Sequence, residues 1–138
     1  MKDRIHLQIV TAAGVVYDNM VESVNIPLTD GTIGVLADHA PLMGAVADGV
    51  VTCTFSGGEE AIAVGVGVVS IVSNEVTVLV RAAELGGDID VARAEAAERR
   101  ARELLARRNA DTDVQRAEAA LHRAVARQHA ADLARRRR

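Results

Sequence analysis

The stretch ELGGDIDVARA, residues 84–94, separates two halves of different character in this 138-residue chain. Before Gly86 and Gly87, β-branched residues and turn residues are frequent. After the two glycines there is no further glycine or proline, and alanine and arginine dominate, which is a composition that favours helix. The sequence therefore predicts two structural units, residues 1–87 and residues 88–138.

The charge follows the same division. Residues 1–87 carry three basic residues against ten acidic ones, a net of −7, whereas residues 88–138 carry thirteen arginines against nine acids, a net of +4. Such an asymmetry indicates two parts with different partners. A nucleic-acid-binding hairpin is one alternative, but the nine acids and the scarcity of aromatic side chains for base stacking argue against nucleic acid as a partner.

The first unit has the pattern of a β-sandwich. Short apolar runs occupy residues 50–55, 61–64, 68–72 and 76–80, and residues 5–9 alternate apolar and polar side chains. Turn signals separate the runs, among them Asp30-Gly31 and Ser73-Asn74. Many short strands with this punctuation favour a sandwich or barrel over a βαβ fold.

The second unit is predicted to form two helices. The first is expected from about residue 88 or 90 to residue 108, with a break at residues 109–111. Thr112 with Gln115 three residues later matches a capping box, which predicts a second helix that opens there and continues to about residue 133. Because the loop is short, the two helices should be antiparallel neighbours.

The helix faces expected to pack are rich in alanine. On the first helix the expected positions are Ile89, Ala92, Ala96 and Leu104, and on the second they are Val114, Ala117, Leu121, Ala124 and Val125. Small side chains bury little apolar area and therefore stabilise the hairpin only modestly. We hypothesise that the hairpin is conditionally ordered and can leave the sandwich.

Several arginines of the second unit lack partners near them in the sequence. Arg123 and Arg127 are four residues apart, and neither has a carboxylate three or four residues away. Like charges placed in this way destabilise a helix by roughly a few tenths of a kcal/mol, so an anion is expected nearby. In a folded hairpin, Arg93 and Arg100 can join them in a site that suits phosphate. The alternative is that these arginines are solvated or rest on the acidic surface of a partner.

No set of residues for catalysis or metal binding is apparent. Lys2 is the only lysine, so the chain has no GxxxxGK[ST] phosphate loop. Asp38 and His39 are adjacent in an extended stretch and should point to opposite sides, which makes a poor catalytic dyad. The single cysteine, Cys53, excludes a cysteine-rich zinc site, and no apolar run approaches the ~20 residues of a membrane span. A stand-alone enzyme or small-molecule-binding sandwich is therefore the disfavoured alternative.

Four segments, in order along the chain, resemble the epsilon subunit family of bacterial F-type ATP synthases. They are IVTAAGVVY at residues 9–17, GTIGVL at 31–36 followed by HAPL at 39–42, NEVTVL at 74–79, and DIDVARA at 88–94. The resemblance implies an α+β fold, with a ten-stranded β-sandwich in residues 1–87 and an antiparallel two-helix hairpin in residues 88–138.

The resemblance also implies a non-catalytic rotor subunit. In this family the sandwich contacts the gamma subunit and the c-ring, coupling c-ring rotation to gamma, and the hairpin can extend into the alpha/beta catalytic head and inhibit ATP hydrolysis. We therefore expect a peripheral protein at the cytoplasmic face of the bacterial cell membrane, without direct membrane insertion and without a required cofactor.

Two groups of site residues are carried over from the resemblance as hypotheses. The folded hairpin of some members binds ATP as a regulatory ligand, and the matching positions here are Glu84, Ile89, Asp90, Arg93, Ala94, Arg100, Arg123 and Arg127. A turn that is expected to contact a partner contains His39, Pro41 and Leu42.

The chain departs from the family pattern on its sandwich. Val66-Gly67-Val68 stands where Gly-Gly followed by Phe or Tyr is usual, and Ser70 replaces a frequent glutamate. Arg81 replaces an aspartate that is common after the last strand of the sandwich.

Overall fold

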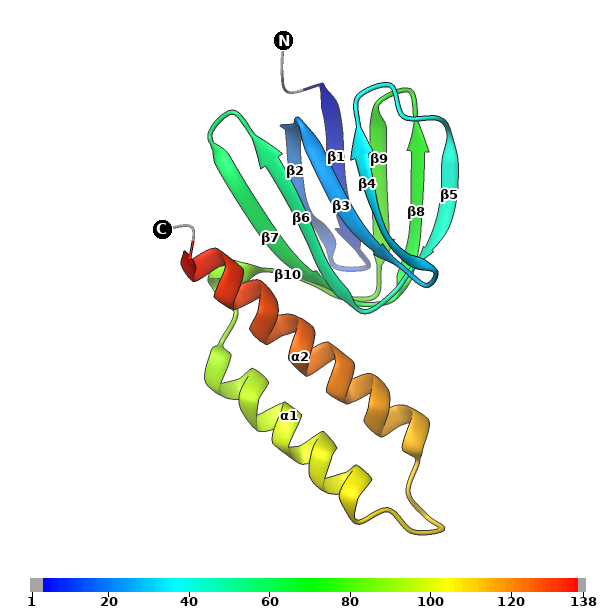
Figure 1. Ribbon diagram of the computed structural model, residues 1–138, viewed down its shortest axis with the longest axis vertical. Helices are drawn as coiled ribbons and strands as arrows, with labels where there is room; N and C mark the ends of the chain where they lie inside the picture. The colour runs from blue at the N-terminus through cyan, green and yellow to red at the C-terminus, as the bar shows by residue number, and fades with distance from the viewer. Residues whose placement is uncertain (1–3, 137–138) are drawn as a thin grey trace.

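A computed structural model describes residues 4–136 and contains ten strands, a short 3-10 turn and two helices (Figure 1). The strands are β1 (Ile5–Thr11), β2 (Gly14–Val21), β3 (Ser23–Leu28), β4 (Gly31–Leu36), β5 (Leu42–Val46), β6 (Gly49–Phe55), β7 (Gly58–Val64), β8 (Gly67–Val72), β9 (Glu75–Val80) and β10 (Ala83–Leu85). The 3-10 turn η1 (Gly86–Asp88) leads to α1 (Val91–Ala106) and α2 (Val114–Arg136). The predicted α+β fold, a ten-stranded sandwich followed by a two-helix hairpin, is confirmed.

The turns form where the sequence places residues that tolerate left-handed backbone. Ser73 and Asn74 join β8 to β9 with φ values of 49° and 64°, and Gly31 opens β4 at φ 124°. Such turns keep successive strands antiparallel and adjacent.

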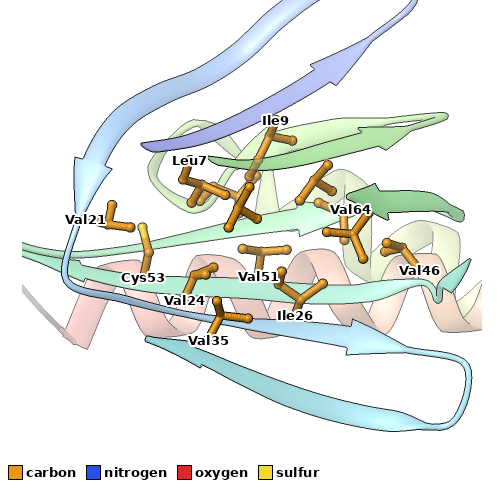
Figure 2. Packing of buried hydrophobic residues seen from close by; sticks show 14 of the residues in the cluster. Leu7, Ile9, Val21, Val24, Ile26, Val35, Val46, Val51, Cys53 and Val64 are labelled. Carbon is orange, nitrogen blue, oxygen red and sulfur yellow. The ribbon is translucent and has the colours of Figure 1, made fainter. Parts of the chain in front are cut away.

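The strands pair in the order β10-β7-β6-β3-β5-β8-β9-β1-β2, with β4 paired to β3 outside this path. The pairing of β1 with β9 is parallel, and the other pairs are antiparallel. Between these strands lies one apolar core of inward-facing residues, part of which Figure 2 shows, including Leu7, Ile9, Val24 and Val51. Since strand residues alternate between the two faces, the outward positions of the same strands remain available for contacts with other elements.

The second half of β7, residues 61–64, is buried on both of its faces. Ile62 and Val64 point into the sandwich core, whereas Ala61 and Ala63 belong to a second cluster with Ile89, Ala130 and Ala131. This explains the unbroken apolar run at residues 61–64, because a strand covered on both faces needs no polar alternation. The second cluster is the place where α2 rests on the sandwich, on the side of β6 and β7 (Figure 1).

Gly86 allows a close approach between the two units. A Cβ atom at this position would collide with the backbone oxygen of Ala130 in α2 and would lie 2.9 Å from the backbone oxygen of Ala61 in β7. A side chain of any size would therefore separate α2 from the sandwich.

The helix starts are capped by aspartates. Asp90 Oδ1 accepts a hydrogen bond from the backbone N–H of Arg93 at 3.1 Å, and Asp113 Oδ1 accepts one from the backbone N–H of Arg116 at 3.0 Å. Each bond satisfies one of the amide groups that a helix start leaves free.

The predicted capping box of Thr112 and Gln115 is wrong. Thr112 Oγ1 instead accepts a hydrogen bond from the backbone N–H of Asn109 at 3.0 Å. This bond stabilises the loop, and Asp113 caps the helix.

The predicted end of the second helix near residue 133 is too early. Arg135 and Arg136 continue α2 and form ion pairs with Asp132 at 2.9 and 3.1 Å.

The contact between α1 and α2 uses smaller side chains than predicted. Ala94 and Ala101 are buried on α1, and Ala117 and Ala124 are buried on α2. The expected positions Ala117 and Ala124 are confirmed, whereas Ala92, Leu104 and Val125 are exposed, Leu104 by 55% and Val125 by 43%. Helices that approach closely accept only small residues at the point of contact, so the larger ones are displaced to the flanks.

Candidate functional site

A pocket of about 350 Å³ lies where α2 crosses the edge of the sandwich. The sandwich contributes Ala63, Val64 and Gly65 from the end of β7, together with Ala82, Ala83 and Glu84 at β10; α2 contributes Arg123, Ala126 and Arg127. The walls are small and apolar apart from three charged side chains. The geometry therefore allows a ligand with an apolar part and an anionic part.

Glu84 and Arg127 form an ion pair across this pocket. Arg127 Nε donates to Glu84 Oε1 at 3.1 Å, with the two side chains 29% and 39% exposed respectively. The pair joins β10 to α2 and supplies one carboxylate that Arg127 lacks within its own helix. A half-exposed pair of this kind contributes roughly 1 kcal/mol or less to the docking of α2.

Arg123 lines the same pocket and is exposed. Within residues 4–136 no ion pair involves its guanidinium group. It also lines a second pocket of about 720 Å³, which continues along α2 toward Asp113 and Arg116. Arg123 is therefore a cation without an ion-pair partner among the described residues, and it lies between two adjoining pockets.

The other two arginines of the expected site are elsewhere. Arg93 and Arg100 are exposed residues of α1 and do not line the pocket that contains Arg123 and Arg127. The expected convergence of four arginines is thus limited in this structure to two, which join Glu84. The spacing of seven residues indicated that Arg93 and Arg100 lie on the same face of α1. It did not indicate in which direction that face points.

Three of the remaining expected site residues are buried or cap a helix, so they serve the packing of the hairpin. Ile89 is buried among the alanines between α2 and β7, Asp90 caps α1, and Ala94 is fully buried. Ile89 thus contributes to the contact between the hairpin and the sandwich, whereas Asp90 and Ala94 stabilise the start of α1.

The expected partner-binding turn lies between β4 and β5. Pro41 is exposed, and His39 and Leu42 are half-buried. His39 Nδ1 lies 2.7 Å from the backbone oxygen of Ala40, while the Asp38 carboxylate accepts from Asn74 Nδ2 at 3.3 Å, so the two neighbours do not pair with each other. The turn is thus fixed to the β8–β9 turn and presents Pro41 to the outside.

An outward-facing row of apolar residues was missed by reasoning from sequence. Strand register places Ala45 beside Val68, Val68 beside Leu79, Leu79 beside Val10, and Val10 beside Val15. We call these five residues the apolar band; within it Val68, Leu79 and Val15 are 47%, 50% and 57% exposed. The signal was the run VVSIV at residues 68–72, in which the outward positions Val68 and Val72 are apolar where a solvated strand would carry polar residues.

The same sheet face carries a polar cluster on β1, β2 and β9. The ring nitrogens of His6 lie 2.6 Å from Asp18 Oδ1 and 2.8 Å from Glu75 Oε2, and Gln8 Nε2 donates to Asp18 Oδ2 at 3.0 Å. The hydrogen bonds to Asp18 and Glu75 raise the pKa of His6, and those from Gln8 and His6 lower the pKa of Asp18. The cluster joins three strands through charged hydrogen bonds.

Two further observations bear on what the chain can do. Among residues 4–136 no group of three or more histidine, cysteine, aspartate or glutamate side chains is arranged to hold a metal ion. Neither α1 nor α2, as far as the structure describes them, is both long enough and apolar enough to cross a membrane.

Comparison with known proteins covers both units. Residues 4–86 match the family described as ATP synthase, Delta/Epsilon chain, beta-sandwich domain, and residues 88–132 match ATP synthase, Delta/Epsilon chain, long alpha-helix domain. The chain is 46% identical over 108 residues to the ATP synthase epsilon chain of Carboxydothermus hydrogenoformans, covering 78% of this chain and 81% of that one. It is 42% identical over 127 residues to the ATP synthase epsilon chain of Gloeobacter violaceus, covering 92% and 96%.

Solved structures show the same fold. A chain in the structure of the Euglena gracilis mitochondrial ATP synthase, OSCP/F1/c-ring, aligns with a TM-score of 0.80 and 20% identity, over 95% of this chain and 82% of that chain. Two matching family domains in the expected order, and relatives of more than 40% identity over most of the chain, confirm the resemblance. The chain belongs to the ATP synthase epsilon chain family.

Proposed function

We propose that this epsilon chain, an accessory subunit of the central stalk rather than a catalyst, couples c-ring rotation to the gamma subunit and restrains ATP hydrolysis through its hairpin. The observation that carries the proposal is that the two units of the fold differ in surface and in packing. A rigid sandwich with an exposed apolar band is joined to a basic hairpin that rests on it through a few alanines and one isoleucine. We place the chain peripherally at the cytoplasmic face of the bacterial cell membrane.

The apolar band is the proposed contact with the gamma subunit and the c-ring. Apolar side chains that are about half exposed, aligned across five strands, are typical of a surface that a partner covers. His39 and Pro41 precede β5 and Leu42 is its first residue, so this turn lies at the opposite end of β5 from Ala45; it is proposed to extend the contact.

The hairpin is the proposed regulatory part. Between α2 and the sandwich, the buried apolar contact consists of Ile89 and four alanines with Val50, Val91 and Leu133 at its margin. Each alanine methyl contributes only about 0.8 kcal/mol when buried. Undocking is therefore accessible, and an extended hairpin with its many arginines would suit the acidic surface of the alpha/beta catalytic head.

ATP is the proposed regulatory ligand of the docked hairpin. The pocket with Glu84, Arg123 and Arg127 has walls from both the sandwich and α2, so it exists only when the hairpin is docked. A ligand that binds only the docked state shifts the population toward that state. ATP would thereby oppose extension and relieve inhibition.

The stalk assignment is tested by co-purification of the tagged full-length chain with the rest of the synthase. We expect gamma and c subunits to be retained by the wild-type chain and lost with Leu79→Lys, which places a charge in the apolar band. Leu104→Lys is the matched control, because Leu104 is 55% exposed against 50% for Leu79 but lies on α1. Equal retention by the two variants would remove the apolar band from the contact.

Regulation and ligand binding need separate measurements. ATP hydrolysis by synthase lacking this subunit should fall when the full chain is added and should recover when residues 88–138 are deleted from it. Calorimetry with ATP should show binding by the wild-type chain and none by Arg123→Ala combined with Arg127→Ala. Hydrolysis that is indifferent to the hairpin, or absence of ATP binding, would contradict the corresponding part of the proposal.

A further inference from the structure

The pocket of Glu84 and Arg127 continues into a longer groove along α2. The pocket of about 350 Å³ and its neighbour of about 720 Å³ share three lining residues, Gly65, Ala82 and Arg123. Beyond Arg123 the groove is lined by Arg81 from the sandwich and Arg116 from α2. We propose that Arg81 and Arg116 form a second anion subsite, which takes the distal phosphates of a nucleoside triphosphate; this inference rests on the proposed ATP site.

The charges along the groove favour the distal end for an anion. Arg127 is already engaged by Glu84 at 3.1 Å, so its charge is largely compensated. Arg81, Arg116 and Arg123 form no ion pair with any residue between 4 and 136. Three guanidinium groups thus gather at one end of the groove without partners, and guanidinium groups bind phosphate oxygens two at a time.

Two carboxylates face the same end and reduce its positive charge without cancelling it. Asp113 lines the groove, but its Oδ1 is occupied by the backbone N–H of Arg116 at 3.0 Å, since it caps α2. Asp48 is half-buried beside Gly65. Three cations therefore stand against two anions, one of which already accepts a hydrogen bond from the helix backbone.

The spacing of the arginines on α2 suits a ligand with several linked phosphates better than a single phosphate. Arg116, Arg123 and Arg127 follow one another at seven and four residues, so they lie on one face of α2. Seven residues correspond to about 10 Å along the helix axis. A single phosphate next to Arg123 would leave Arg116 unused, whereas a triphosphate extends toward it.

The opposite wall of the groove is held in place by the backbone. Gly65 N–H donates to the Ala82 oxygen at 2.8 Å, and Arg81 N–H donates to the Val66 oxygen at 3.0 Å. These bonds tie the β7–β8 connection to the β9–β10 connection, so Arg81 projects from a fixed position. The groove consequently has one end where Ala63, Ala83 and Ala126 surround the paired charges of Glu84 and Arg127, and a cationic end.

Calorimetry on the full chain with ATP, AMP and inorganic tripolyphosphate tests the inference. Arg81→Ala and Arg116→Ala should each weaken ATP and tripolyphosphate binding by about tenfold, the scale of one charge-assisted hydrogen bond, and should leave AMP binding unchanged. Arg99→Ala, an exposed arginine of α1 that lines neither pocket, is the matched control and should bind all three ligands as the wild type does.

The outcomes separate this inference from the proposed ATP site. If the wild type binds ATP and the double variant Arg81→Ala with Arg116→Ala binds it equally well, the second subsite is excluded and the ATP site stands. If the wild type binds neither ATP nor tripolyphosphate, both are excluded. Far-ultraviolet circular dichroism of the variants verifies that a loss of binding does not come from unfolding, since both side chains are exposed.

Discussion

His6 is the residue whose ionisation should be visible in the stability of the sandwich. Its ring lies between Asp18 and Glu75 at 2.6 and 2.8 Å, and these two bonds raise its pKa above the ordinary value of 6.5. A raised pKa means that the folded state binds the proton more tightly than the unfolded state. The contribution of protonated His6 to the free energy of unfolding is therefore complete below pH 6.5, and it is lost as the pH rises through the folded-state pKa.

We expect His6→Gln to flatten this dependence. Urea unfolding followed between about pH 5.5 and 8.5 should show the wild-type midpoint falling with increasing pH, and the variant changing less over the same range. His122→Gln, an exposed histidine on α2, is the control and should keep the wild-type slope. Parallel curves for the wild type and His6→Gln would show that the cluster does not couple protonation to folding.

The ion pair of Glu84 and Arg127 shows how far residue-level prediction could reach. The missing carboxylate around Arg127 was readable from helix spacing alone, because such pairs depend on positions three and four residues apart. Its partner was not, since Glu84 is 43 residues away and is brought close only by the docking of α2 on the sandwich. The sequence shows that an arginine lacks a carboxylate within its own helix, whereas a partner that is distant in the sequence can be identified only from the fold.

At the level of elements, the same limit appears in the helices. The composition after Gly87 predicted both helices and their antiparallel arrangement, because alanine and arginine favour helix in almost any context. The contact face was predicted less well: exposed Leu104 was expected inside and buried Ala101 was not. The reason is geometric, since the distance between two helices decides whether large or small side chains occupy the contact.

Gly86 controls the docking of the hairpin as an element. In Gly86→Ala the new Cβ would collide with the Ala130 oxygen and lie 2.9 Å from the Ala61 oxygen, both of which are backbone atoms. Overpacking of this kind costs about 1–3 kcal/mol. Because it acts between α2 and β7, the cost should fall on docking, and amide hydrogen exchange in α1 and α2 should accelerate by roughly five- to a hundredfold.

Gly87→Ala is the matched control for this prediction. Gly87 is adjacent but exposed, so an added methyl group should leave hairpin exchange within about twofold of the wild type. Unaltered hairpin exchange in Gly86→Ala would mean that the close approach at Gly86 does not hold the two units together. Accelerated exchange throughout the sandwich as well would mean that the substitution acts on the whole fold.

For the molecule as a whole, the two apolar clusters predict two levels of stability. The sandwich core contains large residues from most of the strands, whereas the contact between the sandwich and α2 contains four alanines and Ile89. A matched pair of substitutions separates them. Ile62→Ala, at a fully buried position of the sandwich core, should lower the free energy of unfolding by about 2–5 kcal/mol and accelerate exchange in the sandwich, whereas exchange in the hairpin, which opens by undocking, should change little.

Ile89→Ala removes the same atoms from the contact beneath α2, where the side chain is 8% exposed. Docking should weaken by a comparable amount, but the sandwich should keep its stability because its core is untouched. Exchange measured residue by residue would then accelerate in α1 and α2 while β1, β8 and β9 retain wild-type protection. Loss of protection in these strands as well would show one cooperative unit, and a hairpin that cannot undock from an intact sandwich could not act as the proposed regulator.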